Sequence, residues 1–314
     1  MKLKNFINFT SCKYCFTTEH HYDISYKSRA QKVICLGYFT PFKNDFRLEN
    51  KAYEKSKLIN NKCFDLYITT SKIASRIISV DTGISYYKFL HLGFPRNDNL
   101  LRADTSDQIL DYLTKTLNKK IKKIIIYTPT FRNYEYKKTG LSVRNIFGYE
   151  DMDMEKLNVI LEKHDAVIVA KLHPYQNKTI INRNLPDRVI LSSDIEQFNL
   201  YTYLSISNFL ISDYTSTYFD FLFLDRPIIF NFYDFQKYKL DRGFSFEPIE
   251  EFCAGDIVDS FNSMLDSIEN NLNGIDNYNK KRKFVHNFIN KYHDKNSSER
   301  IINYLFKQKT HETH

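Results

Sequence analysis

A hydroxyl-rich loop that follows a short apolar segment is the part of this sequence best suited to hold phosphate. Residues 208–211 (Asn-Phe-Leu-Ile) have the pattern of a strand, and they run into Ser212-Asp213-Tyr214-Thr215-Ser216. Small hydroxyl residues and an aspartate favour a helix N-terminus, because their oxygens accept from backbone N–H groups that have no helical partner. A helix N-terminus at the carboxyl end of a parallel strand favours anions, and phosphate in particular. A surface helix cap without a ligand fits the same residues, and both interpretations stay open at this point.

The neighbouring residues complete a strand–loop–helix–strand unit. A short buried helix is expected over 218–224, ended by Asp225-Arg226-Pro227, and a second strand over 228–230. Helices are expected near 50–60 and over 72–79, 106–118, 154–163 and 199–205, and strands over 32–36, 64–69, 89–92, 124–127, 166–170 and 189–191. This alternation predicts an α/β protein built from parallel βαβ units.

Polar clusters follow several of the expected strands. They lie at Thr40–Lys43 and Arg96-Asn97 in the first half, and at Thr128–Arg132 and His173 in the second. Carboxyl ends of parallel strands share one sheet edge, so we expect two Rossmann-like domains whose polar loops face a common cleft. The expected organisation is an irregular segment over 1–30, a shortened N-terminal Rossmann-like domain over 31–118, a second, nucleotide-binding Rossmann-like domain over 119–290, and a C-terminal helix and tail over 291–314. Residues 133–150 are expected to form a surface loop, and basic helical sequence to fill the chain from about 256.

Composition narrows the class of partner. The 314 residues carry a formal net charge of +8, with 26% charged and 42% hydrophobic residues, which is typical of a folded protein with an anionic partner. No apolar run approaches 18 residues, and no signal-peptide core follows Met1, so a cytoplasmic protein is expected. Cys12 and Cys15 form a C-x-x-C near His20 and His21, which leaves a metal site possible. No dense Asp/Glu cluster indicates a divalent-ion site, and we expect neither a metal nor a cofactor.

Several motifs, taken in order, resemble those of the CDP-glycerol glycerophosphotransferases of teichoic-acid and capsule synthesis. Residues 93–98 are similar to the family's G-x-P-R-N-D, residues 127–132 to its Y-x-P-T-x-R, and Lys171-Leu172-His173-Pro174 to its K/R-x-H-P. The segment Ser212–Ser216 resembles the most distinctive signature. Further matches are Phe219-Asp220, Arg226-Pro227-Ile228, Tyr233-Asp234, Arg242-Gly243-Phe244, His293-Asp294 and Ser298-Glu299-Arg300. The resemblance covers roughly 33–305 and implies the GT-B fold.

The resemblance implies a reaction and a set of residues. Members of the family transfer glycerol phosphate or a related polyol phosphate from a CDP-linked donor to an acceptor hydroxyl and release CMP. By the same resemblance, His173 is a catalytic candidate that holds the donor pyrophosphate together with the Ser212–Ser216 loop. Arginine side chains would neutralise charge that develops during phosphoryl transfer. The expected substrate-binding residues are Arg96, Asn97, Thr128, Thr130, Arg132, Ser212, Asp213, Thr215, Ser216, Arg226 and Arg242.

The implied partners follow from the reaction. The donor is CDP-glycerol or CDP-ribitol, and the acceptor is a lipid-linked glycan or a polyol-phosphate polymer. The expected location is the cytoplasmic face of the inner membrane, with peripheral attachment, and nucleic acid is not an expected partner. A GT-B glycosyltransferase that uses a nucleotide sugar is the alternative enzyme. A non-catalytic, nucleotide-binding paralogue is the alternative from another class.

One motif departs from the family pattern. The family carries W-H-G-T-P-L-K in its first domain, where the histidine is the base that deprotonates the acceptor. Residues 37–43 here read Gly-Tyr-Phe-Thr-Pro-Phe-Lys, so Tyr38 stands at the position of that histidine. A phenol with an ordinary pKa near 10 is a poor base at neutral pH. Tyr38 therefore remains a catalytic candidate beside three other possible bases, His20, His21 and His91.

Some motif residues fit a structural role equally well or better. Asp213 is more typical of a residue that braces a loop than of one that does chemistry, and Asp220 and Tyr233 are expected to be structural. Arg96 and Asn97 fit either a fixed interdomain linker or a substrate contact. The C-terminal lysines and arginines are expected to form a solvated face.

Overall fold

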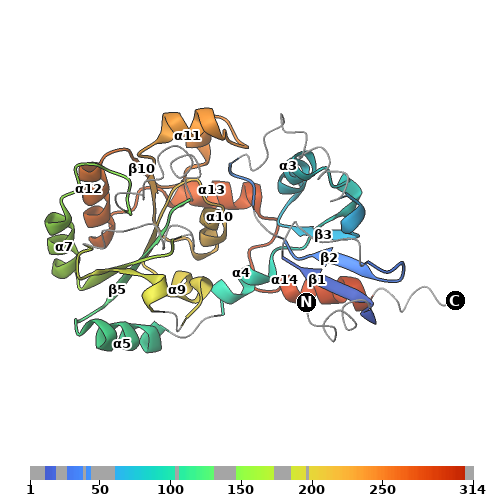
Figure 1. Cartoon of the computed structure of the whole chain (residues 1–314), viewed down its shortest axis with the longest axis horizontal. Coiled ribbons are helices and arrows are strands. Elements are labelled where there is room, and N and C mark those ends of the chain that lie inside the picture. Colours follow the sequence, from blue (N-terminus) through green and yellow to red (C-terminus); the bar gives the residue numbers. More distant parts are fainter. Residues whose placement is uncertain are drawn as a thin grey trace. The chain divides into compact units, whose positions relative to one another are not determined.

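The chain forms two compact units (Figure 1). The computed structural model describes residues 11–18, 27–37, 40–43, 61–102, 106–130, 146–172, 185–195 and 198–307. The first unit comprises Met1–Asp98 and Asn287–His314, and the second comprises Asn99–His286. Both are parallel α/β structures, which confirms the expected fold class. The exact domain boundaries expected from the sequence stay a prediction.

The first unit is built on a parallel sheet with the order β1-β2-β3-β4 in its described part. The strands are β1 (Tyr14–Thr17), β2 (Lys32–Cys35), β3 (Leu66–Thr69) and β4 (Phe89–His91). Strand β1 corrects the expectation that 1–30 is irregular: Tyr14–Thr17 pairs in register with Lys32–Cys35. The remaining elements are α3 (Lys72–Thr82), η2 (Tyr86–Lys88), α14 (Ser297–Ile302), the π-helical turn η6 (Asn303–Lys307) and α4 (Pro95–Leu100), which runs from this unit into the second.

Helix α3 shows how local sequence sets its bounds. The Ser71 side chain accepts a hydrogen bond from the Ala74 backbone N–H at 3.2 Å, as expected for an N-cap. Gly83 ends the helix with φ 72°, a left-handed conformation that favours glycine. The helix predicted to begin after Ser71 is therefore confirmed, and it extends three residues beyond the expected Ser79.

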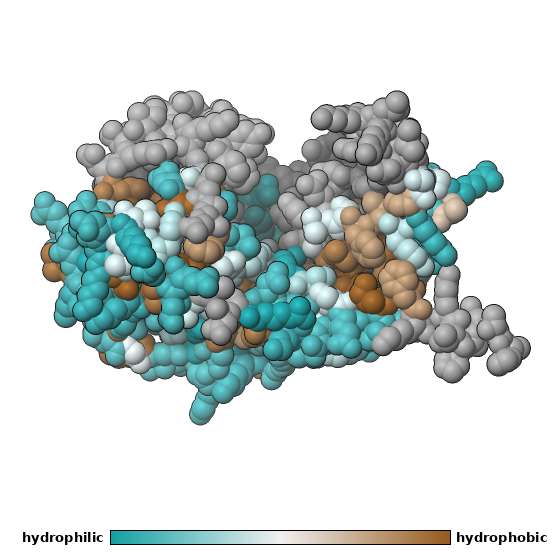
Figure 2. All heavy atoms as spheres, turned by 90° about the horizontal axis from the view of Figure 1, so that it is seen from below, coloured by the Kyte–Doolittle hydropathy of each residue, from teal (hydrophilic) through white to brown (hydrophobic). Residues whose placement is uncertain are grey.

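The two faces of the first sheet are covered unequally. One face packs against α3 through Tyr67, Ile78 and Phe89, all buried. The other packs against α14 and η6 through Ile301 and Leu305, and several of its leucines remain only partly buried. Figure 2, in which the first unit lies at the right, shows hydrophobic side chains gathered on its lower face.

The second unit contains a six-stranded parallel sheet in the order β10-β9-β8-β5-β6-β7, counted over the described ranges. Its strands are β5 (Lys123–Thr128), β6 (Ala166–Ala170), β7 (Val189–Leu191), β8 (Phe209–Ser212), β9 (Ile228–Asn231) and β10 (Asp256–Val258). The chain proceeds from β5 outward to β7 and then returns to β8 on the other side of β5. The strand order therefore reverses between β5 and β8, which is the topological switch point where open α/β sheets bind ligands.

Helices cover both faces of this sheet (Figure 1). One core contains alternate residues of β5, β6 and β8 together with Leu157 and Leu161 of α7 (Met154–Lys163) and Met264 and Ile268 of α12 (Phe261–Leu272). The opposite face carries α9 (Leu200–Ile206) beside β5 and α10 (Thr217–Phe221) beside β8. The remaining elements are α5 (Ser106–Leu117), η3 (Ser192–Asp194), η4 (Leu222–Leu224), α11 (Phe235–Asp241), η5 (Ile249–Phe252) and α13 (Asn279–Ile289), whose last residues enter the first unit.

Two expectations for the second unit were wrong. The chain after about 256 is not helical throughout, because β10 pairs with β9 and extends the sheet. The end of the expected surface loop 133–150 is buried: Phe147 is fully enclosed, and Tyr149 donates to Asn231 Oδ1 at 2.6 Å. A Cβ at Gly148 would lie about 2.4 Å from the Tyr233 ring, so the backbone approaches that ring too closely for any side chain.

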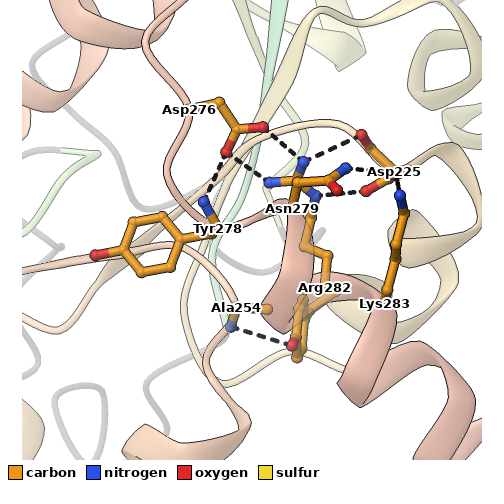
Figure 3. A network of polar contacts seen from close by, with 8 residues as sticks. Asp225, Ala254, Asp276, Tyr278, Asn279, Arg282 and Lys283 are labelled. Atoms are coloured by element: carbon orange, nitrogen blue, oxygen red, sulfur yellow. Dashed lines mark hydrogen bonds and ion pairs between the residues drawn. The ribbon is translucent and has the colours of Figure 1, made fainter.

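A buried arginine fixes the start of α13 (Figure 3). Arg282 is 2% exposed, and its guanidinium donates to Asp225 Oδ1 at 2.9 Å and to both carboxylate oxygens of Asp276 at 2.8 and 2.6 Å. Asn279 adds a bond to Asp225 Oδ2 at 2.7 Å. Asp225 ends η4 in the left-handed region with φ 47°, which confirms the expected break before β9. Paired charges of this kind tolerate burial, whereas a single one does not.

Candidate functional site

The switch point of the second sheet brings together two polar residues that the sequence places 84 positions apart. Thr128, the last residue of β5, is the register partner of Ser212, the last residue of β8. Thr128 is 5% exposed and Ser212 is fully buried, and neither hydroxyl has a hydrogen-bond partner in the described part of the chain. Buried hydroxyls are normally paired, so these two mark a place where another polar group is needed.

Asp213 braces the two loops that leave these strands. Its carboxylate accepts from the Thr130 backbone N–H at 2.8 and 2.9 Å and from the Thr130 hydroxyl at 2.7 Å. The carboxylate is 2% exposed, and the three contacts satisfy it. The expectation that Asp213 braces the loop agrees with this geometry. The Thr130 hydroxyl therefore already donates its hydrogen bond to Asp213.

Tyr214 anchors the next part of the loop to the segment that follows β9. Its ring stacks on Tyr238 with centroids 3.9 Å apart and on Phe232 at 4.8 Å, and its hydroxyl donates to Asp234 at 3.2 Å. The loop is therefore held on both sides, by Asp213 and by Tyr214, which limits its motion.

Thr215 and Ser216 lie at the half-exposed end of the loop, directly before α10. The Thr215 hydroxyl accepts weakly from the Thr217 N–H at 3.4 Å. Ser216 occupies the N-cap position, but its side chain makes no capping hydrogen bond. Helix capping therefore does not explain the serine at this position.

Two cations stand on loops at the carboxyl edge of the same sheet. Lys171 follows β6, and its backbone N–H donates to Tyr127 O at 2.8 Å. Its ammonium makes only a 3.4 Å contact with Leu172 O within the described ranges. Arg242 ends α11, downstream of β9, and is half-buried. Lys171 belongs to a recognised motif but was not among the expected site residues, although its position directly after a parallel strand is a sufficient signal.

The expected role of Arg226 in donor binding is corrected by its position. Its guanidinium donates to the carbonyl oxygens of Ser205 and Ser207, near the amino end of β8. Burial lowers the pKa of this guanidinium, and the carbonyl partners keep the buried charge hydrogen-bonded. Arg226 precedes β9, about 13 Å along the strand direction from the level of Ser212. It secures the opposite edge of the sheet.

In the first unit, the motif over 93–98 is largely structural. Arg96 donates to Gly37 O at 3.0 Å and lies 4.1 Å from the centroid of the Phe94 ring. Asp98 accepts from the backbone N–H groups of residues 297 and 298 at 2.9 and 2.8 Å, which fixes the start of α14. Asn97 differs, because its amide is buried and neither polar atom has a partner in the described part. Of the two expected contacts, Asn97 is the one whose side chain has no hydrogen-bond partner among the described residues.

Several expected site residues lie outside the described residues: His173, Tyr38, Arg132, His20 and His21. His91 is described and lies at the end of β4, where it pairs with Thr69. Burial, with Lys291 and Lys72 nearby, lowers the pKa of His91 below its ordinary value of 6.5. The imidazole is therefore neutral at pH 7.

No group of three potential metal ligands occurs among the residues that the structure describes. Cys12 and Cys15, in or beside β1, are not disulfide-bonded, and Gln31 donates to the Cys12 sulfur at 3.1 Å. Among the described helices, none has the length and apolar character needed to cross a bilayer.

Two parallel α/β units, with a polar loop braced at the switch point of the second, have the architecture of a GT-B-like fold. A family model described as "CDP-Glycerol:Poly(glycerophosphate) glycerophosphotransferase" matches residues 1–307. The chain belongs to this family, as its motifs led us to expect.

Relatives in the family come from teichoic acid synthesis. The teichoic acid ribitol-phosphate polymerase TarK of Staphylococcus aureus is 32% identical over 228 residues, covering 72% of this chain and 42% of the relative. The teichoic acid glycerol-phosphate primase of Bacillus subtilis is 27% identical over 271 residues, covering 84% of this chain and 61% of the relative. The chain thus spans less than two thirds of the length of either protein.

Among solved structures, the wall teichoic acid polymerase TagF aligns with a TM-score of 0.78 at 23% identity. The alignment covers 96% of this chain and 74% of that chain. A UDP-bound S. aureus MnaA aligns with a TM-score of 0.53 at 16% identity, covering 100% and 80% of the two chains. These likenesses show the fold, and they agree with the expected GT-B-like architecture.

Proposed function

We propose that this chain transfers glycerol phosphate or ribitol phosphate from a CDP-linked donor to a hydroxyl of a teichoic acid or related surface-glycan acceptor, releasing CMP. The observation that carries the proposal is the pair of buried hydroxyls of Thr128 and Ser212 at the switch point. Neither has a hydrogen-bond partner among the described residues, and the family match of the chain runs over 1–307. Relatives named as ribitol-phosphate polymerases and glycerol-phosphate primases support both polyols as candidates. A TagF variant has been soaked with CDPG, which supports a CDP-linked donor.

The reaction requires little covalent chemistry from the protein. The acceptor oxygen forms a bond to the phosphorus that carries the polyol, and the bond from that phosphorus to the bridging oxygen breaks. CMP leaves with the electron pair, and a base takes the hydroxyl proton. Catalysis then depends on in-line positioning and on neutralising negative charge.

Different residues are proposed to position the donor phosphates and to neutralise their charge. Thr128, Ser212, Thr215 and Ser216 donate hydrogen bonds to the donor phosphates, while Asp213 holds the loop that presents them. Arg242 lies at the same sheet edge and contributes positive charge. His173 and Arg132 are proposed to join them from the motifs that continue beyond β6 and β5.

The base is proposed to lie in the first unit. Tyr38 occupies the position at which the family has a histidine, and its phenol is poorly suited to accept a proton at neutral pH. His91, neutral at pH 7 and at the carboxyl end of β4, is the candidate base that the described residues support. Asn97 is proposed to orient the acceptor through its amide, which has no hydrogen-bond partner among the described residues.

Donor binding tests the proposed site directly. Isothermal titration of CDP-glycerol and CDP-ribitol into wild type and Ser212→Ala is expected to show at least tenfold weaker binding in the variant, since a bond to a charged phosphate is lost. Ser205→Ala is the matched control, because that hydroxyl donates to Thr202 O at the opposite sheet edge. Equal affinity in wild type and Ser212→Ala would refute the assignment. Turnover of a UDP-sugar in place of a CDP-polyol would favour the glycosyltransferase alternative.

The site of action is proposed to be the cytoplasmic face of the membrane, where a lipid-linked acceptor is present. A net charge of +8 favours an anionic surface. Co-sedimentation with vesicles of anionic phospholipid, but not with neutral vesicles, is the expected result at low salt. Failure to sediment with either kind would contradict peripheral attachment.

A further inference from the structure

Two lysines reach the end of β4 in the first unit from distant parts of the chain. Lys72 is the first residue of α3, two positions after Thr70, which follows β3. Lys291 follows α13, and its backbone N–H donates to Thr70 O at 2.9 Å. His91, the last residue of β4, is the register partner of Thr69 on β3. Three basic side chains therefore gather at the carboxyl edge of this sheet.

Hydrogen bonds to Thr70 fix the segment that carries Lys291. Thr70 is 2% exposed, and its hydroxyl donates to Ile289 O at 2.7 Å. With the bond from Lys291, this makes two hydrogen bonds between residues 289–291 and the loop after β3. The backbone of Lys291 is therefore held against the sheet edge, while its ammonium extends from an exposed side chain.

The charge at this edge is positive and has no carboxylate to balance it in the described part of the chain. Burial, and then the charges of Lys291 and Lys72, lower the pKa of His91, so both ammoniums act on its ring. Its other neighbour is the ring of Tyr86 in η2, with centroids 6.3 Å apart. Neither lysine forms an ion pair with a described residue, and the Lys291 ammonium lies 4.9 Å from the centroid of the Tyr292 ring. The first turn of α3 has no acidic residue, and a helix N-terminus itself attracts anions.

Two buried nitrogen atoms in these segments also lack partners. His91 Nε2 is enclosed and forms no hydrogen bond within the described ranges. The same holds for the side-chain nitrogen of Asn290, which is 3% exposed and directly precedes Lys291. Buried polar atoms are normally hydrogen-bonded. An amide nitrogen and two ammoniums are all donors, so these groups suit the oxygens of an anion.

We propose that Lys72 and Lys291 bind the last phosphate of the acceptor, so that the polyol hydroxyl beside this phosphate reaches His91. The inference rests on the proposed function and adds to it a subsite for the acceptor in the first unit. In a polyol-phosphate chain, one polyol separates the terminal hydroxyl from the last phosphodiester. An anion site beside the base therefore selects an acceptor whose end carries phosphate over an uncharged glycan. Ammonium groups suit this task, because they bind phosphate as point charges.

A solvated cationic surface is the alternative explanation, and it makes a different prediction. Lysines that act only on the imidazole would change the pKa of His91 and leave the affinity for a phosphodiester unchanged. The double variant Lys72→Ala/Lys291→Ala removes both charges from exposed side chains. The matched control is Lys32→Ala/Lys62→Ala, because these lysines are also exposed but lie at the amino ends of β2 and β3.

The experiment is an NMR titration of the full chain with glycerophosphoglycerol, a soluble phosphodiester with a glycerol on each side, observed at the His91 imidazole. Binding to the wild type is expected to raise the pKa of His91, because the anion offsets the two lysine charges. Lys72→Ala/Lys291→Ala is expected to bind about tenfold more weakly, since two charge-assisted bonds at exposed groups are lost, and to show no such rise. The control should bind within twofold of wild type. Both variants should bind CDP-glycerol within twofold of wild type.

The outcomes separate this inference from the function on which it rests. Unchanged glycerophosphoglycerol affinity in the double variant, folded by circular dichroism, would overturn the subsite, and so would a wild type that binds CDP-glycerol but not glycerophosphoglycerol. In both cases the proposed transferase would stand. A wild type that binds neither ligand would overturn both. If the double variant does not fold, Lys291→Ala decides, with an expected loss of about threefold.

A lipid headgroup presents the same phosphodiester, and vesicles of phosphatidylglycerol distinguish this source. The acceptor subsite predicts that the double variant loses affinity for the soluble phosphodiester. Loss of vesicle co-sedimentation in the double variant, with unchanged affinity for glycerophosphoglycerol, would assign the two lysines to the membrane surface and overturn the acceptor subsite.

Discussion

Two threonines on one short segment separate a structural hydroxyl from a functional one. The Thr130 hydroxyl donates to the buried Asp213 carboxylate at 2.7 Å, whereas the Thr128 hydroxyl is buried without a partner in the described part. Valine replaces threonine with nearly the same shape, so each substitution removes one hydroxyl. Thr130→Val should lower the free energy of unfolding by about 1.5–3 kcal/mol, because a hydrogen bond to a charged group is lost. Thr128→Val should raise it by about 1 kcal/mol, because an unpaired buried hydroxyl is removed.

Thr128→Val should lower the transferase activity although it stabilises the fold. If its hydroxyl binds a donor phosphate, Thr128→Val should reduce CMP release from CDP-glycerol roughly 10- to 100-fold, which is the loss of one bond to a charged oxygen. Urea unfolding and a coupled CMP assay on the same preparations measure both quantities. A Thr128→Val chain that is destabilised like Thr130→Val and turns over at the wild-type rate would refute the reasoning.

Three further outcomes follow from buried charges. Arg282→Met should lower the free energy of unfolding by about 3–5 kcal/mol in thermal or urea unfolding, since it leaves the carboxylates of Asp225 and Asp276 without their buried partner. The control is Lys283→Met: the Lys283 ammonium is exposed and 4.0 Å from Asp225, so its loss should change the free energy of unfolding by less than about 0.5 kcal/mol. Equal effects of the two substitutions would contradict the network. The Arg282 guanidinium lowers the pKa of Asp276 below its ordinary 3.8, so the pair's contribution to stability is complete above about pH 4 and is lost as the pH falls through the lowered pKa. This acid dependence should disappear in Arg282→Met, and a wild-type acid limb in that variant would show that Asp276 is not its source. Arg226→Leu should destabilise the fold by roughly 2 kcal/mol while the KM for the CDP-polyol stays within twofold; a larger rise in KM would return Arg226 to the donor site.

The regular interior elements of the second unit could be predicted from the sequence. Helix Met154–Lys163 and strand Ala166–Ala170 have the bounds expected for them, because Asp153 caps the helix and the strand is a continuous apolar run. The strands β1 and β10 could not be predicted in this way. Each has three or four residues and, among the described strands, a single neighbour, so its pattern is short and its stability comes from pairing with a distant segment.

The residues of the candidate site that lie at the ends of strands could be predicted from the sequence. Thr128 and Ser212 were expected to share a sheet edge, and they are register partners. Arg226 was misjudged because it lies close in sequence to the phosphate loop, although its place before β9 already put it at the amino edge. The cavity of about 280 Å³ that Val169 and Phe198 both line could not be foreseen, because it forms only once β6 and α9 pack on the same side of β5.

The central claim, polyol-phosphate transfer from a CDP-linked donor, is tested most directly by CMP release from CDP-glycerol and CDP-ribitol with membrane glycolipid as acceptor. We expect the wild type and Tyr38→Phe to turn over the donor. We expect His173→Ala and His91→Ala to lose this turnover. Binding of CDP-glycerol without CMP release on any acceptor would contradict the account and would identify the chain as a nucleotide-binding member of the family without transferase activity.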